Sequence, residues 1–261
     1  MITEQVITSK NPSTADKSDE IVIELKNIKK SFDKQEVLKD VSLKLFNGEN
    51  LVILGRSGSG KSVLIKCIVR LLIPDEGTIN VLEENVGTLN SAGLDALRKK
   101  IGFLFQSGAL YDSMTVKQNL EFPLRRINKD LKQQEIDEKV LTVLDNVGLA
   151  DALDKMPSQL SGGMRKRISL ARTIIADPKI MLYDEPTAGL DPITSDEISS
   201  LINEVQKKYK TSSIVITHDI ECARTTANRI LMLQDGVVYK EGTLEEIEKS
   251  DDPFIKSFFK L

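Results

Sequence analysis

Eight residues from Gly55 to Ser62 form a glycine-rich segment of the kind that binds nucleotide phosphates. Glycines let main-chain N–H groups turn toward a phosphate, and the helix that follows presents its positive end to it. Lys61 is expected to hold the β- and γ-phosphate oxygens, and Ser62 to ligate Mg²⁺. The segment fits the pattern G-x-x-x-x-G-K-[ST] and reads Gly55, Arg56, Ser57, Gly58, Ser59, Gly60, Lys61, Ser62.

Two acidic residues, Asp184 and Glu185, follow a short apolar run at residues 180–183. The run is typical of a buried parallel strand, which would deliver both carboxylates to the sheet edge where the glycine-rich segment lies. Asp184 is expected to hold Mg²⁺, and Glu185 to polarise an attacking water. A solvated acidic turn is the alternative, but an apolar strand so close before the pair argues against it.

His218 is the only histidine, and it follows another apolar run at residues 213–217. A lone histidine is more often structural than catalytic. At the end of a third strand, however, its imidazole would lie on the same sheet edge as the phosphates. There it could donate to a γ-phosphate oxygen.

A second glycine turn, residues 160–164, opens another predicted helix and is called the signature loop below. Ser161, Gly162 and Gly163 bring a hydroxyl, a close main-chain approach and a helix N-terminus to one anion site. The loop cannot easily fold back onto the chain's own glycine-rich segment. A simple helix N-cap is the alternative interpretation.

Other patterns predict the elements that position these residues. An apolar strand at 51–54 enters the glycine-rich segment, and a helix over 63–72 leaves it. Apolar residues at helical spacing predict a helix over 134–147 within a helical subdomain at about 107–160. The glycine- and serine-rich residues 106–115 are expected to form a mobile hinge, with an ordinary exposed loop as the alternative. The apolar positions of the 134–147 helix are Ile136, Val140, Val143, Leu144 and Val147.

The order of these motifs resembles the ATP-binding cassette (ABC) family from residue 21 to about 242. The resemblance implies an α/β fold: a P-loop NTPase of the ABC type with a RecA-like core, an antiparallel β subdomain and a helical subdomain. It also implies a Mg²⁺-dependent ATPase that binds ATP. Phe32 would stack on adenine, Gln106 would reach Mg²⁺ and the attacking water, and Asp191 would cross a dimer interface.

The same resemblance implies a head-to-tail homodimer. In it, Ser161, Gly162 and Gly163 of each copy cover the nucleotide held by the other copy. Met164 stands where glutamine is most common. Closure of the dimer is still expected, because the serine and both glycines remain. Gln106 would also couple the ATPase to an integral membrane permease.

Three stretches narrow the resemblance to the Mla-type ATPases: residues 105–113, 122–125 and 156–164. Those ATPases energise phospholipid movement in the bacterial cell envelope with a permease and a lipid-binding MCE protein. The resemblance implies a peripheral position on the cytoplasmic side of the inner membrane. Three alternatives stay open: an importer ATPase for amino acids or metals, a non-transport cassette acting on DNA or ribosomes, and a regulator that binds ATP without turnover.

Length and composition fit one nucleotide-binding unit, with 261 residues, 40% of them hydrophobic, and no internal repeat. The basic run at 165–167 is interpreted as a solvated helix face or a contact with a partner subunit. No nucleic acid is expected as a partner, because 36 Lys and Arg face 39 Asp and Glu, giving a net charge of −3. Cys67 and Cys222 are expected to be buried, reduced thiols of a cytosolic protein.

The two ends of the chain are expected to differ from its centre. Residues 1–20 have no signal-peptide pattern and are predicted to be a disordered tail before a nucleotide-binding domain at 21–245. No apolar stretch approaches the ~20 residues that cross a bilayer. Residues 246–261 form an amphipathic extension, expected either to dock on the chain's own core or to contact a second subunit. Its apolar face carries Phe254, Ile255, Phe258 and Phe259.

Overall fold

The computed structural model describes residues 20–259, so the predicted tail lies almost wholly outside the described residues. Within this range ten strands form one sheet in the order β5-β4-β1-β2-β10-β9-β3-β8-β7-β6. The strands are β1 (Ile21–Phe32), β2 (Gln35–Phe46), β3 (Asn50–Leu54), β4 (Glu76–Val81), β5 (Glu84–Asn85), β6 (Ile101–Leu104), β7 (Ile180–Asp184), β8 (Ser212–Thr217), β9 (Arg229–Gln234) and β10 (Val237–Gly242).

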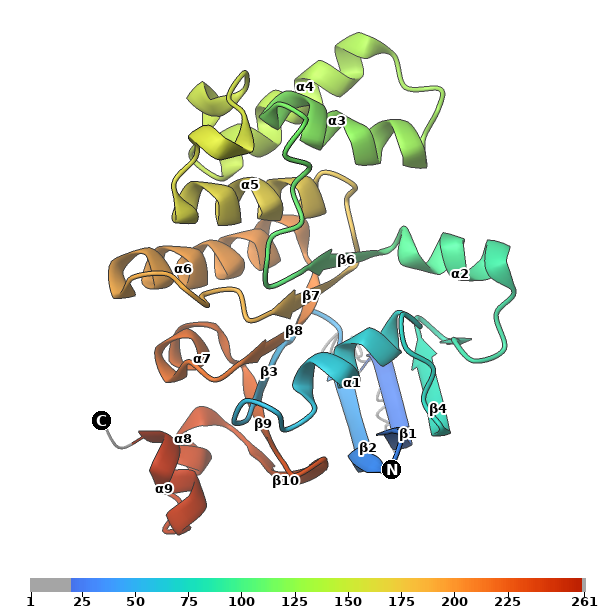
Figure 1. Ribbon diagram of the computed structural model, residues 1–261, viewed down its shortest axis with the longest axis vertical. Coiled ribbons are helices and arrows are strands. Elements are labelled where there is room, and N and C mark those ends of the chain that lie inside the picture. Colours follow the sequence, from blue (N-terminus) through green and yellow to red (C-terminus); the bar gives the residue numbers. More distant parts are fainter. Residues whose placement is uncertain (1–19, 260–261) are drawn as a thin grey trace, which may run out of the picture.

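The helices pack on both sides of this sheet and above one end of it (Figure 1). None of those described combines the length and the hydropathy that a membrane crossing demands. They are α1 (Lys61–Ile68), α2 (Ser91–Arg98), α3 (Val116–Ile127), α4 (Gln133–Asn146), α5 (Gly162–Ile174), α6 (Pro192–Tyr209), α7 (Ile220–Thr226), α8 (Leu244–Glu248) and α9 (Pro253–Phe259), with 3₁₀ turns at Ala150–Ala152 and Pro157–Gln159.

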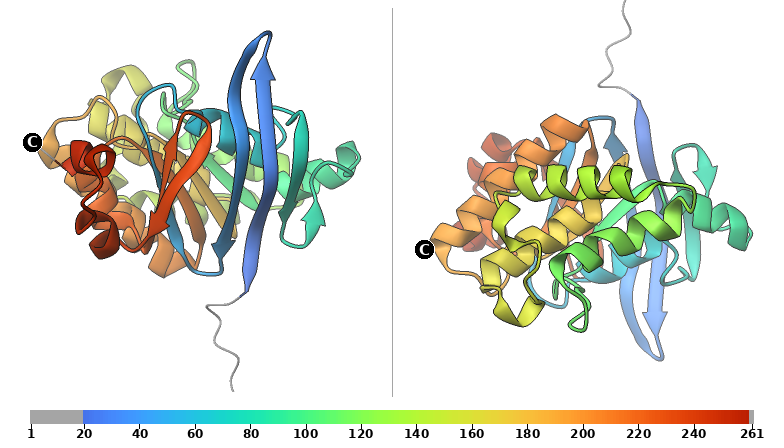
Figure 2. Two further views of the ribbon diagram at one scale, coloured as in Figure 1. Left: turned by 90° about the horizontal axis from the view of Figure 1, so that it is seen from below. Right: turned by 90° about the horizontal axis from the view of Figure 1, so that it is seen from above.

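The sheet has a parallel part and an antiparallel part. Strands β9, β3, β8, β7 and β6 pair in parallel, so their carboxyl ends lie at one edge. Strands β2, β1, β4 and β5 pair antiparallel beside them, and Figure 2 shows the long β1 and β2 side by side. Motifs that end parallel strands are therefore brought together, whatever their separation along the chain.

The parallel strands are buried on both faces, which explains why their sequences are continuous apolar runs. In β3, Val52 and Leu54 join the hydrophobic cluster on one face, while Leu51 and Ile53 join the cluster on the other. This alternation follows from the two-residue period of a strand. The clusters hold the strand ends, and hence the polar residues that follow them, in fixed positions.

The elements predicted from apolar runs are confirmed, with one difference in length. Strands β3, β7 and β8 cover the three predicted runs, and all five apolar positions of the 134–147 pattern are buried, four in α4 and Val147 at its C-cap. Helix α1 ends at Ile68, not at residue 72. Arg70 has a left-handed main chain with φ of 52°, which a continuing helix cannot contain.

Helix α9 docks on the chain's own core. Ile255 is buried, and Phe254, Phe258 and Phe259 pack partly buried against the same cluster as β7 and α6. The Phe254 ring makes edge contacts with the rings of Tyr239 and Phe258, at centroid distances of 4.9 and 5.2 Å. The apolar face predicted for the extension is thus covered within the same chain.

Both cysteines are free and buried, in α1 and α7. Burial raises the pKa of Cys67 and that of Cys222 to about 11. Because the thiolate is the nucleophile, neither thiol should react with Ellman's reagent at mildly alkaline pH until the protein unfolds. Absorbance at the start and after adding guanidinium measures this. Rapid reaction of the folded protein would contradict it, and Cys67→Ser would show which thiol is open.

Candidate nucleotide-binding site

A cavity of about 470 Å³ lies at the carboxyl edge of the parallel strands. It brings together most of the predicted site residues from β1, the glycine-rich segment, the β6–α3 loop and the ends of β7 and β8. Gln35 and Val37 of β2 also line it, which the motifs did not indicate. The lining residues are Phe32, Gln35, Val37, Ser57, Gly58, Gly60, Lys61, Ser62, Val63, Gln106, Glu185 and His218.

Three positions of the glycine-rich segment favour glycine, Gly58 through its main-chain conformation, Gly55 through close neighbours and Gly60 through both. Gly58 and Gly60 have φ of 84° and 101°, the region that favours glycine. A Cβ at Gly60 would lie 2.8 Å from Leu38 Cδ2, and one at Gly55 would lie 2.5 Å from Leu233 O. Gly60 is also the N-cap of α1, and no side chain caps that helix. The free N–H groups at its start fit a phosphate group of a nucleotide.

Lys61 is a buried cation aimed at this segment, with 6% of its surface exposed. Its Nζ donates to the main-chain oxygens of Gly55, at 2.7 Å, and Arg56, at 3.2 Å. It also lies 3.5 Å from Glu185 Oε1, so a cation and a carboxylate are paired in the cavity lining. Phosphate oxygens entering the segment would find an ammonium group already positioned there.

Glu185 has an unusual main chain and a well-held carboxylate. Its φ of 49° is rare outside glycine, asparagine and aspartate, and such conformations cluster at functional sites. Oε2 lies 2.9 Å from His218 Nδ1 and accepts from the His218 main-chain N–H at 3.3 Å. The left-handed turn directs the side chain to His218 and Lys61, which fix the carboxylate at the cavity wall.

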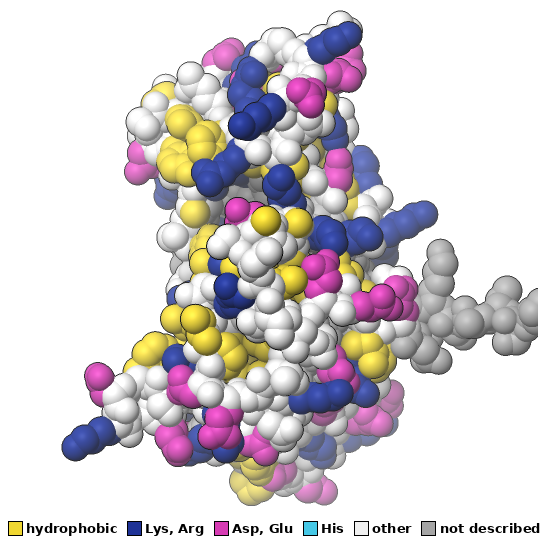
Figure 3. Space-filling view, turned by 90° about the vertical axis from the view of Figure 1, so that its right-hand side faces the viewer, with side chains coloured by type: hydrophobic (Ala, Val, Ile, Leu, Met, Phe, Trp, Pro, Cys, Tyr) yellow, Lys and Arg dark blue, Asp and Glu magenta, His cyan; other side chains and the backbone are white. Residues whose placement is uncertain are grey.

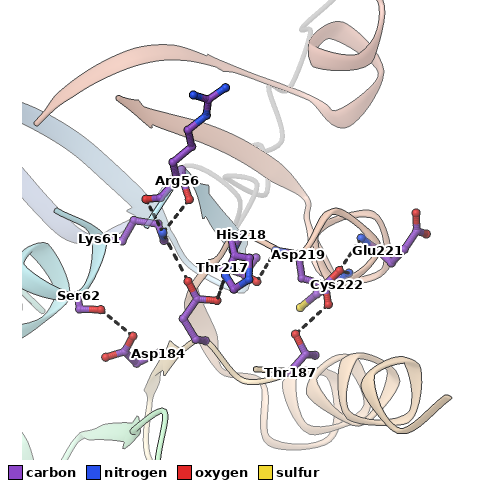
Figure 4. Close-up of polar contacts among 12 residues, drawn as sticks. Arg56, Lys61, Ser62, Asp184, Thr187, Thr217, His218, Asp219, Glu221 and Cys222 are labelled. Atoms are coloured by element: carbon purple, nitrogen blue, oxygen red, sulfur yellow. Dashed lines mark hydrogen bonds and ion pairs between the residues drawn. The ribbon is translucent and has the colours of Figure 1, made fainter. Parts of the chain in front are cut away.

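Ser62 and Asp184 form a pair of hard oxygen ligands beside the cavity. Ser62 Oγ donates to Asp184 Oδ1 at 2.9 Å (Figure 4), and burial raises the pKa of the Asp184 carboxyl. Among residues 20–259 no cluster of three His, Cys, Asp or Glu side chains could hold a metal alone. The hydroxyl of Ser62 and the carboxylate of Asp184 are oxygen donors of the kind that Mg²⁺ prefers, and Mg²⁺ completes its shell with phosphate oxygens and water.

Phe32 and Gln106 both line the cavity. Phe32 is 42% exposed, and Lys30 Nζ lies 5.5 Å from its ring centroid, so one face of the ring is available for stacking. Gln106 is the second residue of the loop between β6 and α3. Two residues of the glycine-rich segment turn away instead: Ser59 is buried, and Arg56 donates to Ser257 Oγ of α9 at 3.1 Å.

The signature loop and Asp191 lie together but not at the cavity. Ser161 caps α5 by accepting from the Met164 N–H at 3.2 Å. A Cβ at Gly163 would lie 2.6 Å from Thr194 Cγ2, and Thr194 donates its N–H to Asp191, the cap of α6, at 3.0 Å. Among the described residues, none of this group lines the cavity, so one chain does not complete both halves of the predicted site.

The interpretation of the basic run as a solvated face is wrong for Lys166. Its side chain is 7% exposed, whereas Arg165 is exposed and Arg167 pairs with Glu197. Burial lowers the pKa of the Lys166 ammonium, opposed by the nearby carboxylates of Asp184 and Glu185. The burial of Lys166 could have been predicted from helical spacing, because Lys166 lies one turn before the buried residues Ser169 and Leu170.

This combination of loops matches a known family. Residues 38–188 match the family model described as ABC transporter. The chain belongs to the ABC transporter family. Its fold is accordingly the α/β P-loop NTPase fold of the ABC ATPases, with a parallel core, an antiparallel β part and a set of helices above the core. ABC ATPases bind ATP, and the cavity at the glycine-rich segment lies where this family's phosphate-binding motif occurs.

Relatives with different names resemble this ABC ATPase to a similar degree. It is 37% identical to "Protein TRIGALACTOSYLDIACYLGLYCEROL 3, chloroplastic" of Arabidopsis thaliana, over 92% of this chain and 73% of that protein. It is 38% identical to "Probable ribonucleotide transport ATP-binding protein mkl" of Mycobacterium leprae, over 91% and 68%. It is 37% identical to "Methionine import ATP-binding protein MetN" of Clostridioides difficile, over 87% and 70%.

A solved structure connects this ABC ATPase with a dimeric relative. The "dimeric structure of a post-hydrolysis state of the ATP-binding cassette MJ0796 bound to ADP and Pi" is 34% identical, with a TM-score of 0.78, over 85% of this chain and 98% of that one. ABC ATPase cassettes form dimers and work with membrane permeases.

Proposed function

We propose that this chain is the ATP-hydrolysing subunit of a transporter that moves phospholipids or other lipids in the bacterial cell envelope. It acts as a homodimer, bound from the cytoplasmic side to an integral permease of the inner membrane. The observation that carries the ATPase is the cavity in which Lys61, Glu185 and His218 meet beside Ser62 and Asp184. This set supplies a phosphate ligand, a base and a metal site at one sheet edge.

In this proposal Lys61 binds the β- and γ-phosphate oxygens of ATP, and Phe32 stacks on its adenine. Ser62, Asp184 and Gln106 hold Mg²⁺, which neutralises charge on the phosphates when bound. Glu185 accepts a proton from the attacking water, and His218 donates to the γ-phosphate. Both groups start from fixed positions, since Glu185 Oε2 and His218 Nδ1 are 2.9 Å apart.

The second copy completes each site. Ser161, Gly162 and Gly163 present the start of α5, while Asp191 lies next to them across Thr194. In the proposed head-to-tail dimer these residues cover the nucleotide of the other copy, and Asp191 crosses the interface. Their separation from the cavity of their own chain supports this arrangement.

A cleft between α2, α3 and α5 supports docking of a permease. It has a volume of about 510 Å³, and its lining combines four cations and one carboxylate, Asp95, with the apolar residues Phe122, Pro123 and Ile127. Figure 3 shows Lys and Arg side chains, among some acidic and apolar ones, on the upper part of the face at the right-hand side of Figure 1. Such a surface fits an amphipathic segment with acidic side chains. The cations are Arg98, Lys99, Arg126 and Arg172.

Two observations support the proposal of lipid cargo and of an MCE-type lipid-binding protein as a further partner. One is the relative whose name refers to a galactolipid, and the other is the pattern of residues 105–113 and 156–164. Affinity purification of the tagged chain from native membranes, followed by mass spectrometry, is expected to recover a permease, an MCE-type protein and phospholipid. Arg126→Glu should reduce the recovered permease and leave ATP binding unchanged. Recovery of a permease without lipid or MCE protein would contradict lipid transport.

Import of an amino acid is the second candidate function. The similarity to the methionine import protein favours it, because that identity equals the identity to the galactolipid-named relative. The same purification distinguishes the two functions. A permease that binds radiolabelled methionine, recovered without lipid, would support import.

A further inference from the structure

Helix α5 holds the loop between β6 and α3 along one of its faces. Lys166, Ser169 and Arg172 are three residues apart and so share this face. Lys166 Nζ donates to Gln106 O at 2.5 Å, and Arg172 Nη1 donates to Ala109 O at 2.9 Å. Figure 1 shows the loop running past α5 on its way to α3. The loop that contains Gln106 is therefore attached to the helix that begins at the signature loop.

The loop makes a tight approach to α5 between these two hydrogen bonds. Gly108 and Ala109 have φ of 80° and 53°, so two consecutive residues are left-handed. A Cβ at Gly108 would lie 2.6 Å from Ser169 Oγ. The main chain of the loop therefore lies directly against α5 at Gly108.

Lys166 differs from the other two contacts because it also reaches the catalytic strand end. Its Nζ lies 3.5 Å from Glu185 O, and the side chain is 7% exposed. A buried ammonium group needs acceptors to offset the loss of water. Here both acceptors are main-chain oxygens of residues in the proposed site. One side chain of α5 thus touches the backbone of Gln106 and of Glu185.

We propose that Lys166 is a positioning residue through which the position of α5 determines the positions of Gln106 and Glu185. The inference rests on the proposed hydrolysis of ATP, in which those two side chains act. Lys166 is called a positioning residue because it does not line the cavity and its hydrogen bonds go to main-chain oxygens of Gln106 and Glu185. It fixes the main-chain positions from which both side chains extend. In the proposed dimer the signature loop docks on the other copy's nucleotide, and a shift of that loop would move the hydrolytic groups through Lys166.

Two substitutions separate this role from a general need for a buried side chain. Lys166→Met keeps a similar length but removes every donor. Lys166→Gln keeps a donor for Gln106 O without the charge. Lys166→Met is expected to lower kcat by about 10- to 100-fold, because small misplacements of reacting groups have effects of that size. KM for ATP should stay near the wild-type value, and Lys166→Gln should recover part of kcat.

Hydrogen–deuterium exchange of residues 105–111, measured without nucleotide, gives a readout independent of turnover. Exchange should be faster in Lys166→Met and closer to wild type in Lys166→Gln. Lys207→Met, on the exposed face of α6, is the matched control and should change neither quantity.

Wild-type kcat in Lys166→Met would overturn the inference. So would a parallel loss of ATP affinity and melting temperature, since that pattern indicates a structural role alone. If the wild-type protein itself releases no phosphate, the proposed function fails instead. The exchange of residues 105–111 then decides the linkage, and unchanged exchange in Lys166→Met refutes it.

Discussion

Replacing Glu185 with glutamine is expected to leave ATP binding intact and to lower ATP hydrolysis by about 10²- to 10⁴-fold, the range typical of a lost general base. Glutamine has the same shape, so its amide oxygen can take the place of Oε2 beside His218 Nδ1. An amide is not a base at neutral pH and cannot accept a proton from the attacking water. The change therefore removes the chemistry and retains the geometry.

The same variant should hold two copies together in the presence of Mg²⁺ and ATP, because uncleaved nucleotide stays between them. Phosphate release measures the rate, fluorescence of a labelled ATP analogue measures binding, and light scattering measures the dimer. Glu197→Gln is the matched control, because Glu197 pairs with Arg167 at the exposed start of α6. Wild-type turnover in Glu185→Gln would refute the role proposed for Glu185.

Most of the candidate site could be predicted because its residues follow buried parallel strands. Three parallel strands end at Leu54, Asp184 and Thr217. Each is an apolar run that is followed along the chain by a polar motif and then by a helix. Each run can be recognised from the local sequence. Because parallel strands have their carboxyl ends at one edge of the sheet, the motifs that follow the runs must lie close together in space. The prediction that Glu185 and His218 share one sheet edge therefore needed no knowledge of the strand order, whereas their direct contact was not predicted.

The antiparallel part of the sheet could not be placed in the same way. Strands β1 and β2 have several register shifts, and β10 pairs with β2 at a single position, Val237 with Asp40. Such pairings depend on long-range packing, which a local pattern does not report. Gln35 and Val37 consequently entered the cavity lining unpredicted.

The orientation of side chains within charged runs and loops also could not be predicted from the sequence. On the basis of its composition, the basic run is interpreted as one charged patch. In a helix, however, successive residues are rotated by about 100° and point to different sides. Lys166 thus turns inward while Arg165 turns to solvent. The contact between Arg56 and Ser257 joins residues 201 positions apart, and no local rule anticipates it.

Lys61→Ala is expected to weaken ATP binding by about 10- to 100-fold. A hydrogen bond to a charged group contributes about 1.5–3 kcal/mol, and each 1.4 kcal/mol is a factor of ten. The substitution also removes the cation 3.5 Å from Glu185 Oε1 and leaves that carboxylate with His218 alone. Titration with a fluorescent ATP analogue measures the affinity. Lys207→Ala, which loses the same charge at an exposed site, should bind ATP normally.

Lys61→Ala and Ser161→Arg should each have strongly reduced ATPase activity alone, measured at an ATP concentration too low to saturate Lys61→Ala, and should recover activity when mixed. Ser161 is exposed, so a bulky residue there should spare the fold and obstruct only the partner's nucleotide. In a mixed dimer one site contains both damaged groups, while the other combines an intact Lys61 with an intact Ser161. Phosphate release from the mixture, beyond the sum of the separate variants, measures this complementation. If the signature loop served its own chain's cavity, both sites of every mixed dimer would stay damaged and no activity would return.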